Sequence, residues 1–388
     1  MTEFDRRRRK MLMGMIAAPA LPAILTACTR QDAEDPSHPP ESSAPEPAPD
    51  PTPTPTPVPP ADKAARDELA ARITRIGESF GGEMGIGVQD VESGWRTGFN
   101  ADAFLPQQSV SKLWVAITLL SQVDKGQFDL WQPITITRHD LTLFHQPIRS
   151  KVLRNGSYTL TAEALIEQAL TKSDNTANDA LLNAIGGPDA VRQMLAAKKI
   201  NGVRFGPGER LMQSRIAGLQ WDQNYAIENR FFDARDKVPD QRRKAAFEAY
   251  LADPVDGAKP AAIADALARL AAGKLLSPKS TSFLIDTLKN TSSGPRRLKG
   301  GTSGGWSVAH KTGTGQFYGN EQSGYNDVGI AFSPDGRAYG MAVQIGRTTK
   351  PTIARMEMMQ QVTRAVIDFE QARKSAAAAG AEETETAA

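Results

Sequence analysis

Proline makes up 12 of the 25 residues from Pro36 to Pro60, and this density limits where the chain can fold. Proline fixes φ and has no backbone N–H group, so the segment cannot enter the interior of a helix or a sheet. We expect it to sample polyproline II instead, a semi-rigid spacer of roughly 80 Å at ~3.1 Å per residue. We therefore predict a linker over residues 28–61 and one folded domain over residues 62–374. Residues 375–388, rich in alanine and without an apolar period, are predicted to be a disordered tail.

The first 27 residues have the pattern of an export signal. Five basic residues start at Arg6, and the apolar run that follows is interrupted by two prolines. A membrane-spanning helix needs ~20 apolar residues, so this shorter run is typical of a signal peptide. Leu25-Thr26-Ala27-Cys28 resembles a bacterial lipobox, and the arginine run resembles a twin-arginine signal. The resemblance implies cleavage before Cys28, lipid on its sulfur, and a periplasmic protein anchored to a membrane. The alternative is a plain anchor helix with an incidental cysteine.

Composition excludes several classes of function. A formal net charge of +2 provides no basic field for nucleic acid, and 6% aromatic residues provide no stacking platform for single strands. One cysteine cannot form an internal disulfide, and four histidines with one thiol do not suffice for a zinc finger. His139, His145 and His310 are too dispersed along the chain for a metal site. We therefore expect no metal, no cofactor and no nucleic-acid partner, and we expect a monomer.

Strand-like runs lie near both ends of the folded domain, and helical periodicity fills the middle. The predicted strands are Met84–Asp90, Trp95–Asn100, Trp306–His310, Val328–Ser333 and Tyr339–Ile345. The predicted helices include residues 69–80, 109–125, 161–170, 176–185, 260–270, 278–288 and 351–373. This order predicts an α/β fold of the α+β type, in which one antiparallel sheet is flanked by helices and an all-helical lobe is inserted. We expect the functional site in a cleft between the lobes.

Ser109-Val110-Ser111-Lys112 places a hydroxyl and an amine three residues apart on a predicted helix. Residues at that spacing share a helix face, so the Lys112 amine can lie against the Ser109 hydroxyl. A serine becomes an effective nucleophile when a neighbouring base takes its proton. An amine can act as that base if burial or positive charge lowers its pKa. Taken alone the motif is weak, because a lysine on a helix is more often a solvated charge.

Two further short motifs carry groups that can bind a substrate. Ser173-Asp174-Asn175 lies between two predicted helices and offers a hydroxyl that can pass protons and an amide that can bind a carbonyl. Taken alone it is an N-cap for the following helix. Lys311-Thr312-Gly313-Thr314-Gly315 lies at the end of a predicted strand. Its lysine and hydroxyls can hold a carboxylate, and its glycines permit close approach of the backbone. Taken alone it is a strand end with a turn.

The three motifs together, in this order, are the signature of class A β-lactamases and penicillin-binding proteins. From about Ala64 to Arg373 the chain resembles a class A serine β-lactamase, and in particular the extended-spectrum branch of that family. The segments that carry the resemblance are Gln108–Val110, Gln122–Gly126, Gly294–Gly300, Ala309–Thr314 and Asn326–Ile330. The resemblance implies hydrolysis of β-lactam antibiotics through a covalent acyl-serine intermediate.

The resemblance also implies a role for each motif residue. Ser109 attacks the lactam carbonyl, and the backbone N–H groups of Ser109 and Thr314 form the oxyanion hole. Lys112 and Ser173 move protons during acylation, and Asn175 binds the amide of the substrate's side chain. The substrate carboxylate is held by the K-T-G segment, which consists of Lys311, Thr312, Gly313 and Thr314. No arginine partner for that carboxylate can be placed from the sequence.

Glu209 decides between two enzymes that share the acylation step. In class A enzymes a loop glutamate activates water on the acyl-enzyme, and the resemblance places Glu209 at that position. Read without the resemblance, Glu209 is a surface loop charge. Asp179 matches the extended-spectrum variant of the residue under that loop. His145 falls near the position where the family has an aromatic residue at the cleft mouth.

Three departures from the family pattern leave alternatives open. Gln213 replaces an asparagine or histidine beside the deacylating water, and Pro207 replaces an arginine that commonly pins the loop. The chain also has roughly thirty extra residues between Gly218 and Lys259, more than an ordinary connection. Their aromatic residues suggest a folded flap beside the site, and the alternative is a surface excursion. The rival functions are a penicillin-binding DD-peptidase that barely deacylates and a non-catalytic β-lactam or peptidoglycan sensor.

Overall fold

The computed structural model describes residues 60–386, so the predicted signal peptide, the lipidation site Cys28 and nearly all of the linker lie outside the described residues. The strands are β1 (Glu83–Asp90), β2 (Arg96–Phe99), β3 (Leu105–Pro106), β4 (Pro133–Thr137), β5 (Ser157–Thr161), β6 (Gly257–Ala258), β7 (Ser307–Thr314), β8 (Phe317–Tyr318), β9 (Glu321–Phe332) and β10 (Ala338–Thr348). The helices are α1 (Pro60–Phe80), α2 (Lys112–Asp124), α3 (Arg149–Asn155), α4 (Ala162–Thr171), α5 (Asn175–Ala184), α6 (Gly187–Ala197), α7 (Glu209–Ile216), α8 (Arg230–Asp236), α9 (Asp240–Ala252), α10 (Pro260–Ala271), α11 (Pro278–Lys289) and α12 (Thr352–Thr386). Short 3₁₀ turns are η2 (Gln108–Ser111), η3 (Arg138–Asp140), η4 (Gln223–Ala226) and η5 (Leu298–Gly301).

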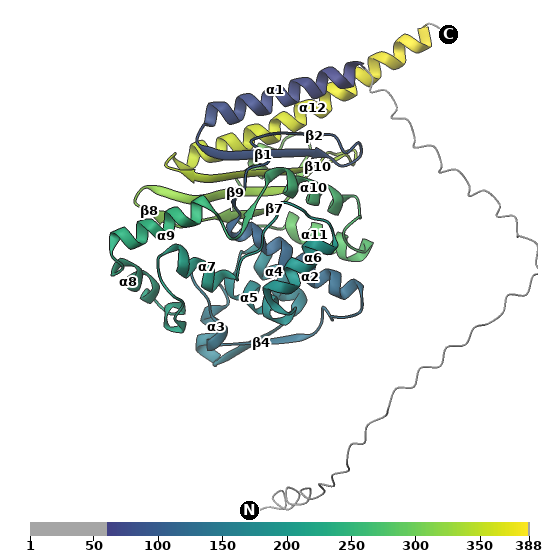
Figure 1. Cartoon of the computed structure of the whole chain (residues 1–388). Helices are drawn as coiled ribbons and strands as arrows, with labels where there is room; N and C mark the ends of the chain where they lie inside the picture. Colours follow the sequence, from purple (N-terminus) through teal and green to yellow (C-terminus); the bar gives the residue numbers. More distant parts are fainter. Residues whose placement is uncertain (1–59, 387–388) are drawn as a thin grey trace, which may run out of the picture. The chain divides into compact units, whose positions relative to one another are not determined.

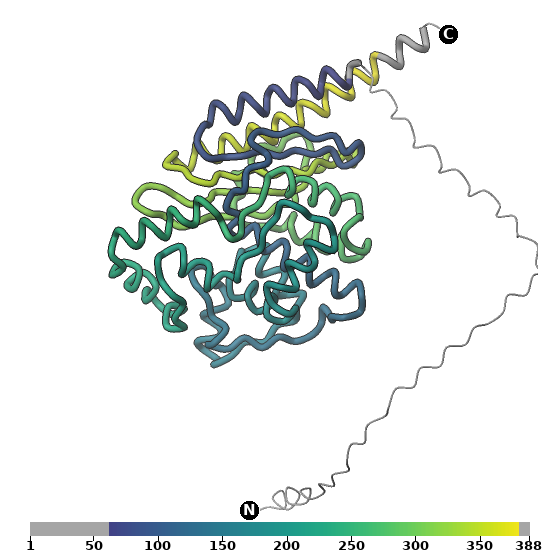
Figure 2. The backbone as a smooth tube through the Cα atoms, in the orientation of Figure 1, coloured from purple at the N-terminus to yellow at the C-terminus, as the bar shows by residue number. Residues whose placement is uncertain are grey.

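The main sheet combines strands from both ends of the described chain, as predicted. Its order is β2-β1-β10-β9-β7 with every neighbouring pair antiparallel, and β8 pairs with β9. The first and last helices, α1 and α12, lie side by side on one face of this sheet, and the helical lobe lies beyond the other face (Figures 1 and 2). The predicted fold class is therefore confirmed, except that the inserted lobe also contains the two-stranded sheet β4–β5.

The sheet has an apolar core on each face, because successive side chains of a strand point to opposite faces. On β9, Val328 and Ile330 belong to the large core shared with the helical lobe, whereas Ala331 packs under α1 and α12. Helix α2 runs through the large core and is buried without interruption from Lys112 to Ser121. The predicted nucleophile segment is therefore held at the start of a buried helix of the lobe.

The ends of the domain differ from the predicted boundaries. Helix α1 begins at Pro60, because proline is tolerated in the first helical turn, where no N–H donor is needed. Helix α12 continues to Thr386, past the end predicted for the folded domain at Lys374. Alanine and glutamate are strong helix formers, and a helix can continue on that propensity after its apolar period ends. Within residues 60–386, no helix is long and apolar enough to cross a membrane.

Residues between Gly218 and Lys259 fold into η4, α8 and α9, a segment we call the insertion. Its aromatic residues pack into two small apolar clusters. In one of them, Phe231 of α8 packs with Leu143 and Ala217. In the other, three residues of α9 pack with two residues of α7: Phe247, Tyr250, Leu251, Met212 and Ile216. The insertion is therefore a folded flap, and the surface excursion is excluded.

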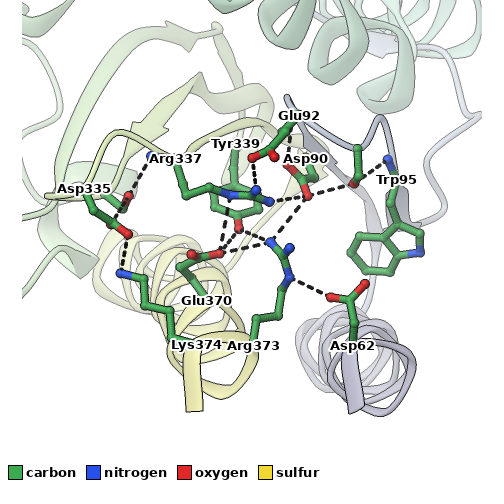
Figure 3. A network of polar contacts seen from close by, with 12 residues as sticks. Asp62, Asp90, Glu92, Trp95, Asp335, Arg337, Tyr339, Glu370, Arg373 and Lys374 are labelled. Carbon is green, nitrogen blue, oxygen red and sulfur yellow. Dashed lines mark hydrogen bonds and ion pairs between the residues drawn. The ribbon is translucent and has the colours of Figure 1, made fainter. Parts of the chain in front are cut away.

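A network of charged side chains joins α1 and α12 to the ends of β1 and β10 (Figure 3). Arg337 Nη2 donates to the buried Asp90 Oδ2 at 2.8 Å. Arg373 Nε donates to Asp62 Oδ1 at 2.6 Å, and its Nη1 lies 3.2 Å from the buried Glu370 Oε2. Two arginines thus neutralise carboxylates that the fold has removed from water.

Substitution of Arg337 by methionine is expected to reduce the free energy of unfolding by about 3 kcal/mol, because it leaves buried acids with one cation fewer. Urea denaturation measures this loss. The matched control is Arg72→Met, since Arg72 also joins α1 to α12 through Asp368, but in an exposed ion pair. The control should lose less than about 1 kcal/mol. Equal losses in the two variants would contradict the assignment of the network as a buried clamp.

Candidate active site

A cleft of about 460 Å³ lies where the edge strand β7 meets the helical lobe and the insertion, a volume suited to a small molecule. Its walls include six of the predicted residues, namely Ser109, Ser173, Asn175, Glu209, Thr312 and Thr314. Lys112, Lys311 and Gly313 are buried against these residues. The structure therefore brings the three motifs and the loop glutamate to one place.

Ser109 and Lys112 occupy the turn that leads into α2. Lys112 Nζ donates to Ser109 Oγ at 2.7 Å, as the three-residue spacing predicts. The same Nζ also forms an ion pair with Glu209 Oε1, and both charged side chains are buried. One amine thus contacts the predicted nucleophile and the predicted deacylation base.

Close packing of β7 against the nucleophile turn explains Gly313. A Cβ atom at this position would lie 2.2 Å from the backbone oxygen of Gln107, which is shorter than any real contact. Gly313 does not line the cleft, and its place in the structure is to let β7 approach the turn. The residue before the nucleophile, Gln108, has a left-handed φ of 54°, so the turn is held in a strained conformation.

Ser173 and Lys311 form a second hydroxyl–amine pair across the cleft from the first. Lys311 Nζ donates to Ser173 Oγ at 3.0 Å and to the Thr312 backbone oxygen at 2.9 Å. Burial lowers the pKa of the Lys311 ammonium well below its ordinary value, and the positive charge of Lys112 lowers it further. Lys311 therefore releases a proton more readily than an ordinary lysine.

In the motif Ser173-Asp174-Asn175, the aspartate has a structural role and the other two residues line the cleft. Asp174 caps α5, since its Oδ1 accepts from the Ala177 N–H at 3.0 Å, and its Oδ2 accepts from the Ile148 N–H at 2.9 Å. Ser173, with a left-handed φ of 57°, and Asn175 line the cleft on either side of that cap. Asn175 Nδ2 also donates to the Leu143 oxygen at 2.9 Å, which orients its amide.

Glu209 is the first residue of α7, and its carboxylate points into the site with only 3% of the residue exposed. Its backbone N–H donates to Asp179 Oδ1 at 3.2 Å. Burial raises the pKa of the Asp179 carboxyl, and the charge of Glu209 adds to this effect. Gln213 follows one helical turn later, and its Nε2 lies 3.3 Å from Glu209 Oε2. Glu209 is therefore fixed inside the cleft and is not a surface loop charge.

Arg297 is the cation that the sequence could not place. Its Nη2 donates to Thr314 Oγ1 at 2.7 Å, and its Nη1 donates to the Asn326 oxygen at 2.6 Å. The guanidinium lies 3.8 Å from the centre of the Tyr325 ring and contributes to the cleft wall. Its position depends on contacts with β7 and β9, so only the segment Gly294–Gly300, already part of the family resemblance, pointed to it.

No group of three acidic, histidine or cysteine side chains able to hold a metal occurs in the described part of the chain. Of the three histidines considered, His310 is buried against Asp327 with Nδ1 2.9 Å from Oδ1. His145 lines the mouth of the cleft beside Phe144. The site thus includes amines, hydroxyls, one acid and two guanidinium groups, a set suited to acyl transfer by nucleophilic catalysis.

Comparison with known families decides the identity of the fold. Residues 68–369 match the model described as the β-lactamase enzyme family. The chain belongs to this family. The predicted resemblance to its class A serine enzymes is confirmed by the relatives. β-Lactamase VEB-1 of Pseudomonas aeruginosa is 28% identical over 289 residues, which cover 74% of this chain and 84% of that protein. β-Lactamase CTX-M-8 of Citrobacter amalonaticus is 28% identical over 71% of this chain and 79% of its own length.

Solved β-lactamases share the fold. The crystal structure of a β-lactamase from Chitinophaga pinensis superposes with a TM-score of 0.63 at 27% identity, over 79% of this chain and 98% of that one. An ancestral class A β-lactamase superposes with a TM-score of 0.60 at 28% identity, over 77% and 99% of the two chains. The similarity therefore covers nearly the whole of each solved enzyme.

Asp256, near the end of the insertion, binds the segment that leads into the nucleophile turn. Its Oδ2 accepts from the Gln108 N–H at 2.7 Å, and its backbone oxygen accepts from Gln107 Nε2 at 2.5 Å. The end of the insertion is thus bound directly to the nucleophile turn.

The pH dependence of stability tests the burial of this anchor. Burial raises the pKa of the Asp256 carboxyl to about 6 from an ordinary 3.8. Because the folded state binds this proton more tightly than the unfolded chain does, the contribution of Asp256 to stability falls as pH rises from about 4 to about 6. The Asp256→Asn variant lacks this loss. Its free energy of unfolding relative to wild type should rise by about 3 kcal/mol between about pH 3.5 and pH 7. A difference that stays constant across chemical denaturation at these pH values would contradict the raised pKa.

Helix α8 of the insertion forms part of the cleft wall. Phe232 and Arg235 of α8 line the cleft together with Phe144 and Phe317. The rings of Phe144 and Phe232 are 5.9 Å apart, so α8 rests on the cleft mouth. The flap beside the site is thus as the sequence suggested, but the individual residues of this wall could not be predicted because they come from three separate segments.

Proposed function

We propose that the protein hydrolyses β-lactam antibiotics through a covalent acyl-enzyme on Ser109. The observation that carries this proposal is the position of Lys112 Nζ, which lies 2.7 Å from Ser109 Oγ and also contacts the buried Glu209. A base beside the nucleophile supports acylation, and a second base in the same cleft supports removal of the acyl group.

Acylation begins when the Lys112 ammonium passes a proton to its ion-pair partner Glu209 or to water in the cleft. The neutral amine then takes the proton of Ser109, and Oγ attacks the lactam carbonyl. The developing oxyanion is bound by the backbone N–H groups of Ser109 and Thr314. The lactam C–N bond then breaks, and the Ser173–Lys311 pair delivers a proton to the leaving nitrogen. The proton that Lys112 released at the start replaces it, so Glu209 is a carboxylate when deacylation begins. The lowered pKa of Lys311 supports this delivery, since such an amine releases its proton more easily.

Deacylation completes the cycle. Glu209 takes a proton from water, the resulting hydroxide attacks the ester carbonyl, and Ser109 Oγ leaves with a proton returned through Lys112. The Gln213 amide, 3.3 Å from Glu209, supplies a second polar group beside that water. A glutamine thus replaces the asparagine or histidine usual in the family.

The cleft also offers partners for the invariant parts of the substrate. The Arg297–Thr314 pair, with Thr312 and Lys311, provides cationic and hydroxyl donors for the carboxylate. The Asn175 amide binds the substrate's side-chain amide on the other side of Ser109. These contacts orient the lactam carbonyl toward the nucleophile.

A DD-peptidase that acylates and stays acylated is the second candidate. The buried Glu209 beside the nucleophile favours the hydrolase, because such a peptidase has no use for a water-activating acid there. Purified protein incubated with a chromogenic cephalosporin should form product for many turnovers. A single equivalent of product with no steady state would establish the peptidase or the sensor.

The proposal extends to the cellular location. Residues 1–27 direct export and are removed, Cys28 receives a lipid, and the proline-rich linker holds a monomeric enzyme away from the periplasmic face of the membrane. The lipobox-like sequence supports this. In cells, Cys28→Ala should move the protein from the membrane fraction to the soluble periplasmic fraction, as measured by immunoblotting. Unchanged partitioning would contradict lipid attachment.

A further inference from the structure

Tyr250 of α9 brings a buried hydroxyl from the insertion to the back of the active site. Its oxygen accepts from Gln108 Nε2 at 2.7 Å and donates to Asp256 Oδ1 at 3.0 Å. Burial raises the pKa of this hydroxyl well above its ordinary value, and the charge of Asp256 raises it further. Tyr250 therefore keeps its proton, and it donates that proton in the hydrogen bond to Asp256.

This hydrogen bond fixes the orientation of the Gln108 side chain. A hydroxyl that donates to a carboxylate can only accept from Gln108, so Gln108 must present its Nε2 to Tyr250. The Ser323 backbone oxygen accepts the second hydrogen of that Nε2 at 3.1 Å. The carbonyl end of Gln108 is therefore left to face Gln213.

Gln213 links the oriented Gln108 side chain to Glu209. Gln213 Nε2 donates to Gln108 Oε1 at 2.9 Å, and the same nitrogen lies 3.3 Å from Glu209 Oε2. On its other side, Gln316 Nε2 donates to Gln213 Oε1 at 2.9 Å. If Gln213 were flipped, its carbonyl oxygen would face both the Gln108 oxygen and the Glu209 carboxylate, which is repulsive.

We propose that Tyr250 is a positioning residue for deacylation. Its hydroxyl orients Gln108, and Gln108 in turn orients the amide of Gln213 toward Glu209. The inference rests on the proposed hydrolase function. It gives the insertion a role in the reaction, because Tyr250 lies among the residues that exceed the family pattern. Tyr250 touches neither Ser109 nor Lys112, so acylation does not depend on its hydroxyl.

The test is Tyr250→Phe, which keeps the ring in its apolar cluster and removes only the hydroxyl. Gln108 then loses one of its two acceptors, and both amides can turn. We expect deacylation to slow about tenfold, the rate equivalent of one hydrogen bond. Because acylation is unchanged, kcat and KM should fall together while kcat/KM stays within about twofold of wild type. Intact-mass spectrometry should show a larger acylated fraction during turnover.

The matched control is Tyr318→Phe. Tyr318 also binds α9 through its hydroxyl, which donates to Asp240 at 2.9 Å, but it has no contact with Gln108 or Gln213. It should keep the wild-type kcat and KM. A Tyr250→Phe variant that merely folds poorly would lower kcat and kcat/KM equally with KM unchanged, and that result overturns the proposal.

The outcomes separate the two proposals. If wild type turns over and Tyr250→Phe deacylates at the wild-type rate, the positioning role is wrong and the hydrolase function stands. If wild type acylates without turnover, or does not acylate, the proposed function is wrong and the positioning role falls with it. If Tyr250→Phe slows acylation as much as deacylation, Tyr250 stabilises the nucleophile turn as a whole. The proposal that it acts specifically on deacylation is then overturned.

Discussion

Glu209→Gln should convert the enzyme into one that reacts with a β-lactam once and then stops. The substitution keeps the size of the side chain and removes the group that takes a proton from water. Loss of a positioned general base lowers a rate by about 10² to 10⁴-fold. Acylation should continue, because Ser109 keeps its contact with Lys112 at 2.7 Å.

Stopped-flow absorbance with a chromogenic cephalosporin should record a burst of one equivalent per enzyme and then a strongly reduced steady state. Intact-mass spectrometry should find the acyl group, and peptide mapping should locate it on Ser109. The control is Glu163→Gln, which makes the same change in the first turn of α4, outside the cleft wall. An unchanged steady state in Glu209→Gln would remove this residue from the mechanism.

The family motifs could be placed from sequence because their geometry is local or nearly so. The three-residue spacing of Ser109 and Lys112 on a helix start leads directly to their contact. Helix periodicity likewise located α2, α4, α5, α10 and α11 to within a few residues. In these segments short-range spacing and burial point to the same conformation.

Features that depend on distant contacts could not be predicted. Arg297 is oriented by backbone oxygens of β7 and β9, and the chain holds 46 lysines and arginines from which composition cannot choose. The insertion places Phe231 against Leu143 and Tyr250 against Gln108, contacts between segments far apart in sequence. Its aromatic residues are scattered along the segment. Only the folded chain shows which of them belong to the site.

Lys112→Ala should abolish acylation itself, in contrast to the single burst of Glu209→Gln. Without the amine, Ser109 has lost the base that lies closest to its hydroxyl, and kcat/KM should fall by about 10³ to 10⁴-fold. No acyl-enzyme should accumulate at any time, as measured by single-turnover kinetics and intact mass. The variant also leaves the Glu209 carboxylate buried without its cation.

The double variant Lys112→Ala/Glu209→Gln separates these two effects, because it removes the unpaired acid together with the amine. If the absence of a base is the cause, the double variant should acylate as slowly as Lys112→Ala. Recovery of acylation in the double variant would show that the stranded carboxylate, and not the missing base, blocks the reaction. The remaining candidate for the base is the Ser173–Lys311 pair, whose lysine has a lowered pKa. If Lys112→Ala keeps the wild-type acylation rate while Ser173→Ala loses it, proton abstraction belongs to that pair and the assignment of Lys112 is wrong.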